Sequence, residues 1–222
     1  MKKLIIITAV LLSQVTFSQV TKNTGDFNKI TGFDKIRVKL VAANENKVEL
    51  KGKYEAEAEV INNNGELKIR LPLGKFLDGE DLLATVYFKK LDAIEANEGS
   101  YIFCNTEIKA INFKLFAKEG SHIDATINAS KISVTSANGS EIELTGQTQN
   151  LDIVINSGGK FEGKDCISSQ VAVSVNAGGF AEVNATDLVD AKTRAGGTIT
   201  IYGKPKQINQ KTVLGGTIKE FQ

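Results

Sequence analysis

The chain has 222 residues, and its 27 Lys or Arg side chains nearly balance its 26 Asp or Glu side chains, which gives a formal charge of +1. Nucleic-acid binding depends on clustered basic residues that neutralise phosphates. The even balance and the lack of a basic cluster therefore argue against a nucleic-acid partner. The length suits one elongated domain, or a small cap joined to a repetitive body.

The first 18 residues have the order of a secretory signal peptide. Lys2 and Lys3 precede an apolar run over residues 4–12, and small residues close the segment, which predicts cleavage before Gln19. The run is short for a transmembrane helix, and no Cys follows it to carry a lipid anchor. We therefore expect an exported chain, in the periplasm, at the cell surface or secreted. Removing Lys2 and Lys3 leaves 25 basic and 26 acidic side chains, a charge of −1.

Residues 19–90 predict short β-strands with no evident repeat. Apolar and polar residues alternate, with the period of a half-buried strand, over residues 36–40, 48–50, 56–60 and 67–71. Between the last two runs, residues 62–65 read Asn-Asn-Asn-Gly, a strong turn signal. We interpret this part as antiparallel strands that cap the body that follows, because the end of a solenoid otherwise exposes unpaired backbone groups.

Residues 91–222 repeat one pattern seven times. Each copy has a corner glycine followed by Ser or Gly, and successive corners lie 18 to 21 residues apart. Apolar residues stand three positions after and five positions before most of these glycines. A period near 20 residues, with alternation on both sides of a corner, is typical of a solenoid. The corner glycines are Gly99, Gly120, Gly139, Gly158, Gly178, Gly196 and Gly215.

The copy around Gly158 shows why a coil is expected. Leu151, Ile153 and Ile155 alternate with other residues before the corner, and Phe161 resumes the apolar series after it. No stretch of the repeats has a convincing helical period. The sequence therefore predicts an all-β fold, a right-handed parallel β-helix with seven coils of about 19 residues stacked at about 4.8 Å. A meander of Gly-rich hairpins is the alternative, and the even spacing disfavours it. With no Pro/Ser-rich linker, cap and coils should form one body.

Several segments give the chain a family resemblance. They are FDKIRVKL at 33–40, ELKIRL at 66–71, the serial corners from NEGS to LGG, and GGTITIYGKP at 196–205. Over residues 30–222 the chain resembles the head GIN domain family of proposed autotransporter adhesins. The resemblance implies an exported β-solenoid with an antiparallel N-terminal part. It implies no established catalytic residues.

A row of carboxylates stands four residues past successive corner glycines, on the predicted solvent side. Stacked about 4.8 Å apart, they repel one another unless they are screened or bridged. Calcium prefers several carboxylate oxygens and is the candidate cofactor. Screening by lysines such as Lys160 and Lys164 is the simpler interpretation. The row consists of Asp124, Glu143, Glu162 and Glu182.

The His and Cys residues give little sign of catalysis. His122 is the single histidine and follows a corner by two residues, a position we expect to be exposed. Cys104 and Cys166 follow corners three coils apart, roughly 14 Å, which exceeds the span of a disulfide. We therefore predict two free thiols, with Cys104 in the core.

The leading functional hypothesis is a non-enzymatic binding scaffold for a glycan or a cell-envelope protein. Tyr101 and Phe180, each two residues after a corner, are the candidate residues for stacking on sugars. A polysaccharide-active enzyme that uses the acidic row is the second hypothesis, although the coils have no insertions to build a cleft. A structural envelope protein that assembles as a homo-oligomer through the C-terminal coil is the third.

Overall fold

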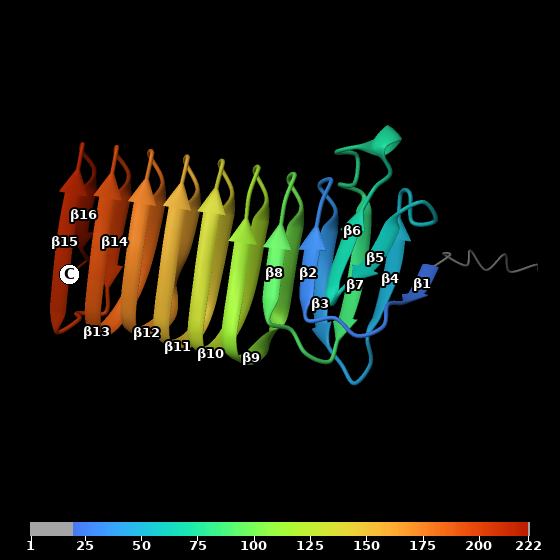
Figure 1. Ribbon diagram of the computed structural model, residues 1–222, viewed down its shortest axis with the longest axis horizontal. Helices are drawn as coiled ribbons and strands as arrows, with labels where there is room; N and C mark the ends of the chain where they lie inside the picture. The colour runs from blue at the N-terminus through green and yellow to red at the C-terminus, as the bar shows by residue number, and fades with distance from the viewer. Residues whose placement is uncertain (1–19, 222) are drawn as a thin grey trace, which may run out of the picture.

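The computed structural model describes residues 20–221, so the predicted signal peptide lies outside the described residues. Their only helical segment is the short 3₁₀ turn η1 (Leu73–Lys75). Among residues 20–221 no helix is long and apolar enough to cross a membrane. Figure 1 shows the strands stacked along one axis, with the N-terminal part at one end and the last coil at the other.

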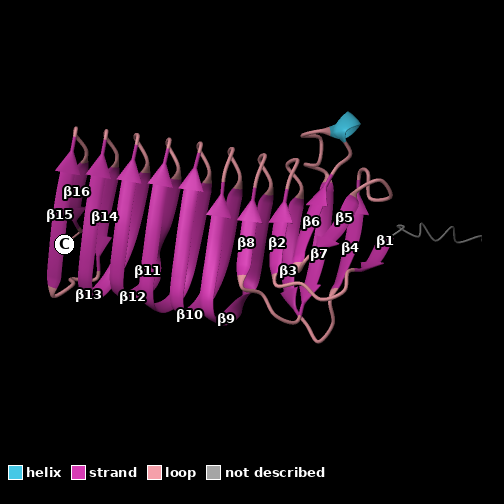
Figure 2. Ribbon diagram, in the orientation of Figure 1, coloured by secondary structure: helices cyan, strands magenta, loops and turns pink. Residues whose placement is uncertain are grey.

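The body is the predicted β-solenoid with coils of about 19 residues. Each long strand runs through a first arm, bends, and continues as a second arm, so that one strand supplies both sides of a coil (Figure 2). Adjacent strands pair in parallel. The strands are β9 (Tyr101–Ala117), β10 (His122–Ala137), β11 (Glu141–Asn156), β12 (Lys160–Asn176), β13 (Phe180–Arg194), β14 (Thr198–Tyr202), β15 (Gln207–Val213) and β16 (Thr217–Glu220). At the C-terminal end the two arms of a coil are separate strands: β14 and β16 are first arms, and β15 is a second arm.

The core is a set of apolar stacks between the two arms. One stack on the first arms is in register across six coils and is fully buried. Each large aliphatic or aromatic side chain buried in this way contributes about 1.5–3 kcal/mol. Because side chains alternate along a strand, the residues directly before and after each of these point to the surface. The stack is Ile102, Ile123, Ile142, Phe161, Ala181 and Ile199.

The corners are tight turns with two successive residues in the left-handed region. Asn138 has φ 54° and Gly139 has φ 71°, the combination that a type I′ turn requires. Ser140 N–H closes this turn on Ala137 O at 3.2 Å. Gly139 N–H donates to Ser157 O of the next coil, so the turns also hydrogen-bond to one another along the edge. The glycine spacing therefore reflects a stacked turn.

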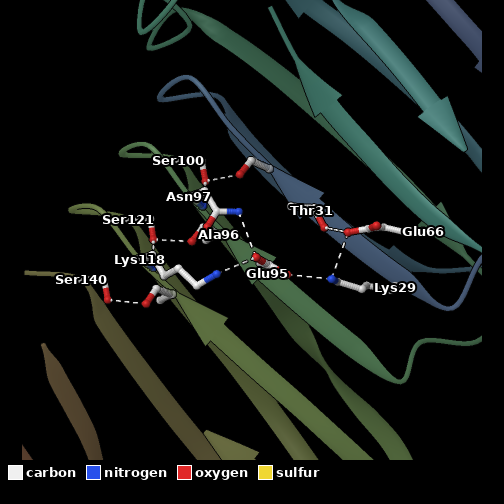
Figure 3. A network of polar contacts seen from close by, with 12 residues as sticks. Lys29, Thr31, Glu66, Glu95, Ala96, Asn97, Ser100, Lys118, Ser121 and Ser140 are labelled. Carbon is white, nitrogen blue, oxygen red and sulfur yellow. Dashed lines mark hydrogen bonds and ion pairs between the residues drawn. The ribbon is translucent and has the colours of Figure 1, made fainter. Parts of the chain in front are cut away.

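Whether Ser or Gly follows a corner glycine depends on the side chain beside it in the preceding coil. Ser140 is buried, and its hydroxyl donates to Ala117 O at 2.7 Å. Ser100 and Ser121 repeat this bond to the coil before them (Figure 3). In later coils the neighbouring side chain is larger: Ser136 stands where the earlier coil has Ala117, and a Cβ atom on Gly159 would lie 2.8 Å from Ser136 Oγ. The change from Ser to Gly follows from close packing.

The N-terminal part is not purely antiparallel, so that prediction was wrong in part. Strands β2 and β3 pair in parallel with β8 and β9 and form a further coil before the first glycine corner. Its turn uses Asp34 (φ 59°) and Lys35 (φ 60°) instead of glycine, which hid it from a glycine-based pattern. Strands β6 and β7 also stack in parallel, on β2 and β3. These strands are β2 (Lys29–Gly32), β3 (Arg37–Ala42), β6 (Glu66–Arg70), β7 (Leu82–Phe88) and β8 (Ala93–Ala96).

The antiparallel strands that were expected form the outermost layer. Strand β4 (Lys47–Gly52) pairs antiparallel with β7 and with β1 (Val20–Asn23), and β5 (Glu59–Asn63) pairs antiparallel with β6. The solenoid therefore begins at β2, well before residue 91. The segment between β3 and β8 is an insertion that closes its N-terminal end.

Candidate functional site

The outer surface of the first arms carries the predicted site residues, and we call it the first-arm face. Its residues stand in two straight rows, because parallel pairing puts equivalent positions of successive coils side by side. The first row, two residues after each corner glycine, is Tyr101, His122, Glu141, Lys160, Phe180, Thr198 and Thr217. The second row, two residues further on, is Phe103, Asp124, Glu143, Glu162, Glu182, Thr200 and Lys219.

Aromatic side chains gather at the N-terminal end of the first-arm face. The rings of Tyr101 and Phe103 stack with centroids 5.1 Å apart and an interplanar angle of 26°. His122 meets Tyr101 edge-on at 4.9 Å. The Arg37 guanidinium lies 5.9 Å from the Tyr101 centroid. Together they form a half-buried aromatic platform. Phe103 was missed by the sequence reasoning, although alternation places residues 101 and 103 on the same face.

Charged side chains fill the middle of the face. His122 Nδ1 lies 3.7 Å from Glu141 Oε2, and His122 Nε2 lies 3.5 Å from Glu143 Oε1. Lys160 Nζ lies 2.6 Å from Glu141 Oε1 and also contacts Glu162. Bonds to the Glu141 and Glu162 carboxylates raise the pKa of Lys160 above its usual value. Lys160 therefore remains charged and partly neutralises the carboxylates.

The four predicted carboxylates are stacked in register, but only two of them belong to a compact carboxylate group. Oxygens of Glu141, Glu143 and Glu162 lie within 4.8 Å of one another. Asp124 and Glu182 are outside this group. Glu141 was missed because it belongs to the first row, although its side chain points outward beside that of Glu143. Lys160 occupies part of the group, so a cation would have to displace it.

Aromatic side chains return towards the C-terminal end of the face. Phe180 lies in the first row four strand steps, or about 19 Å, from Tyr101, and Thr198 and Thr217 continue the row beyond it. The structure therefore puts the two predicted aromatic residues on one face without bringing them together. Tyr202 donates its hydroxyl to Glu182 Oε1 at 3.0 Å and packs against Phe221 with centroids 4.7 Å apart.

Both cysteines are free, as predicted, and both are buried, whereas the prediction placed only Cys104 in the core. Cys104 pairs in register with Ala125 and Ala125 with Leu144, so the thiol occupies an inward position of the core. Burial raises the pKa of the Cys166 thiol to about 11. Neither thiol is suited to nucleophilic chemistry, because the reactive form is an accessible thiolate.

The outer surface of the second arms carries a different polar network near the N-terminal end (Figure 3). Lys29 Nζ bridges Glu95 Oε2 at 2.7 Å and Glu66 Oε1 at 3.0 Å. Lys118 Nζ reaches the other oxygen of Glu95 at 3.3 Å, and Thr31 donates to Glu66 at 2.7 Å. This network joins strands β6, β2 and β8 and the turn after β9. Since its charges are paired with one another, we interpret it as a brace between coils.

Comparisons with known proteins place this geometry in a family. A family model described as "Putative auto-transporter adhesin, head GIN domain" matches residues 26–205. A crystal structure of a "putative adhesin" from Bacteroides fragilis has a TM-score of 0.84 at 20% identity, covering 92% of this chain and 97% of that chain. One from Parabacteroides distasonis has a TM-score of 0.74 at 20% identity, covering 92% and 96%.

A second structure from Parabacteroides distasonis, a "putative lipid binding protein", has a TM-score of 0.69 at 15% identity, covering 92% of this chain and 96% of that chain. At these identities the likeness shows a shared fold. The comparison with curated proteins gives no significant match.

Proposed function

Because the chain belongs to the head GIN domain family of proposed auto-transporter adhesins, we propose that it is an exported, non-enzymatic scaffold that binds an extended glycan on its first-arm face. The family name and the related fold support a surface or envelope partner. The proposed compartment is the periplasm or the cell surface, which the sequence expectation of export also supports.

One observation carries this proposal: in the first row the aromatic residues Tyr101 and Phe180 flank a polar stretch formed by His122, Glu141 and Lys160. Tyr101 and Phe180 are outward and half-buried, about 19 Å apart along the solenoid axis. Aromatic rings provide an apolar surface for the faces of sugar rings. Glu141, Lys160 and their neighbours offer acceptors and donors for hydroxyl groups in between. A straight row suits a chain-like ligand better than a compact one.

The charged groups of the face support binding rather than cleavage. Glycoside hydrolysis uses two carboxyl groups on opposite sides of the scissile bond, one of them protonated. Here Glu141 and Glu162 share the Lys160 ammonium on one flat surface. Neither has the separate environment that would divide acid and base roles between them.

Affinity electrophoresis through gels that contain soluble polysaccharides tests the proposal. Tyr101→Ala and Phe180→Ala should each weaken retardation about three- to tenfold, because each removes a stacking surface. Phe116→Ala is the matched control, since Phe116 is a half-buried outward aromatic residue of the second arm. The proposal that the first-arm face binds the glycan would be wrong if Phe116→Ala weakened retardation equally. It would also be wrong if Tyr101→Ala and Phe180→Ala did not weaken retardation.

A further inference from the structure

A cavity of about 420 Å³ lies near the N-terminal end, away from the rows described above. The loop after β6 and the residues directly after β2 form part of its lining. Its apolar lining comes from Phe33, Leu71, Leu73 and Phe76. Cavities of this size typically hold small molecules.

A buried carboxylate holds the loop in place. Asp34 is only 3% exposed, and its Oδ2 accepts from Leu71 N–H at 2.9 Å while its Oδ1 accepts from Leu77 N–H at 3.2 Å. The Asp34 carbonyl also accepts from Gly79 N–H at 3.0 Å. Both carboxylate oxygens are thus used by the loop backbone, which makes the cavity pre-formed.

The loop exposes large apolar side chains that packing alone does not require. Leu73 is 95% exposed and Phe76 is 54% exposed. Both line the cavity, next to the more buried Phe33 and Leu71. Exposed apolar residues gathered around a depression are typical of a binding site.

The basic side chains that line the cavity are paired with carboxylates, but the lining carboxylate of Glu98 is not paired with a basic side chain in the described part of the chain. Arg70 Nε is paired with Glu59 Oε2 at 2.7 Å, and Lys68 Nζ with Glu66 Oε2 at 3.4 Å. Glu98 has no ion-pair partner among residues 20–221. Burial, followed by repulsion from Asp34 and Glu119, raises the pKa of Glu98, so its surroundings would be relieved by a positive charge.

We propose that this cavity binds an amine with a hydrocarbon body, the ammonium group on Glu98 and the apolar part against Leu73 and Phe76. The basic side chains are already paired, so an anionic ligand would have to compete with Glu59 and Glu66 for them. The Glu98 carboxylate accepts a hydrogen bond from the Asp34 backbone but pairs with no basic side chain among residues 20–221, so a cation can pair with it without breaking an ion pair.

Three probes of equal length separate charge from apolar contact: octylammonium, octanoate and octanol, titrated into the mature chain by calorimetry at neutral pH. Octylammonium should bind best. Glu98→Gln should weaken its binding about tenfold, the value of one charge-assisted bond. Glu119→Gln is the matched comparison, because Glu119 holds the same turn position in the next coil and does not line the cavity. As a neighbouring charge that only repels Glu98, it should affect binding much less than Glu98 does. Phe76→Ser should weaken all probes that bind.

Several outcomes would overturn the proposal. Octanoate binding as tightly as octylammonium would assign the site to anions, and octanol binding as tightly would leave Glu98 without a role. Equal effects of Glu98→Gln and Glu119→Gln, or no binding of octylammonium, would also contradict it. Glu98→Gln should not lower Tm, since it removes repulsion, so weaker binding by this variant cannot be attributed to unfolding.

Discussion

A Cβ atom on Gly179 would lie 2.6 Å from Cγ2 of Ile155, one coil earlier. Two coils earlier the same pair of positions is Ala117 with Ser140, where the small side chain leaves room for a hydroxyl that bonds across the coils. The two positions therefore trade volume with each other along the solenoid.

This relationship predicts a compensating pair of mutations. Gly179→Ser should destabilise the fold by about 1–3 kcal/mol through overpacking, and Ile155→Ala by about 2–5 kcal/mol through a cavity. The double variant recreates the small-residue/Ser pair and should be more stable than the sum of the single losses predicts. Chemical denaturation of the four proteins measures the coupling. Strict additivity would show that the two positions do not share space.

Calcium binding on the first-arm face stays a prediction, now centred on Glu141, Glu143 and Glu162. Millimolar calcium should raise Tm by displacing Lys160 and bridging the carboxylates. The double substitution Glu143→Gln and Glu162→Gln should abolish this rise. Glu182→Gln is the control, because Glu182 is in the same row and outside the compact group. An unchanged rise in the double variant would rule out this site.

The network around Lys29 predicts an acid-sensitive contribution to stability. Burial alone would raise the pKa of Glu66, but hydrogen bonds from Thr31 and Lys29 outweigh it and lower the pKa to about 2. A lowered folded-state pKa gives stability that is present above the unfolded value of 4.5 and is lost as pH falls toward 2.

Glu66→Gln should therefore cost about 1 kcal/mol at neutral pH, allowing for solvent screening, and flatten the fall of Tm between pH 4.5 and 2. Glu80→Gln, at an exposed loop position, is the control and should leave the profile unchanged. An unaltered pH profile for Glu66→Gln would mean that the network adds no net stability.

Assembly through the last described coil is a further prediction. Leu214 is 80% exposed and Phe221 is 60% exposed there, and the outer edges of β15 and β16 pair with no strand among residues 20–221. Such an edge can pair with a second copy. Sedimentation should show a mass that rises with concentration, and Phe221→Arg should abolish the rise. Leu73→Arg, at the opposite end, should have no effect. A monomer at all concentrations would contradict assembly through this coil.

The sequence predicted the coils well because the turn is chemically demanding. Two left-handed residues in a row favour glycine at the second position, so Gly139 and its equivalents mark each corner in the sequence. The coil that turns at Asp34 and Lys35 carries no such mark. Asp tolerates the left-handed region, and the buried Asp34 carboxylate also holds the neighbouring loop, which a local pattern does not reveal.

The sequence predicted which residues of the candidate site are stacked in a row, but not which side chains contact one another. Equal spacing correctly stacked Glu143 on Glu162, because register follows from the repeat. Which side chains meet depends on rotamers and on neighbours in the other row, so the contact of Lys160 with Glu141 and the stacking of Tyr101 on Phe103 had no signal in the period alone. The cavity beside Phe76 depends on a loop outside the repeats.

The most direct test of the central claim applies residues 19–222 to a panel of immobilised polysaccharides and scores retained protein and released sugar on each spot. The account predicts retention without release, on at least one polysaccharide, that Tyr101→Ala and Phe180→Ala weaken. Release of reducing ends would contradict it and favour a polysaccharide-active enzyme. Folded protein that is retained on no polysaccharide would also contradict it and favour a structural role.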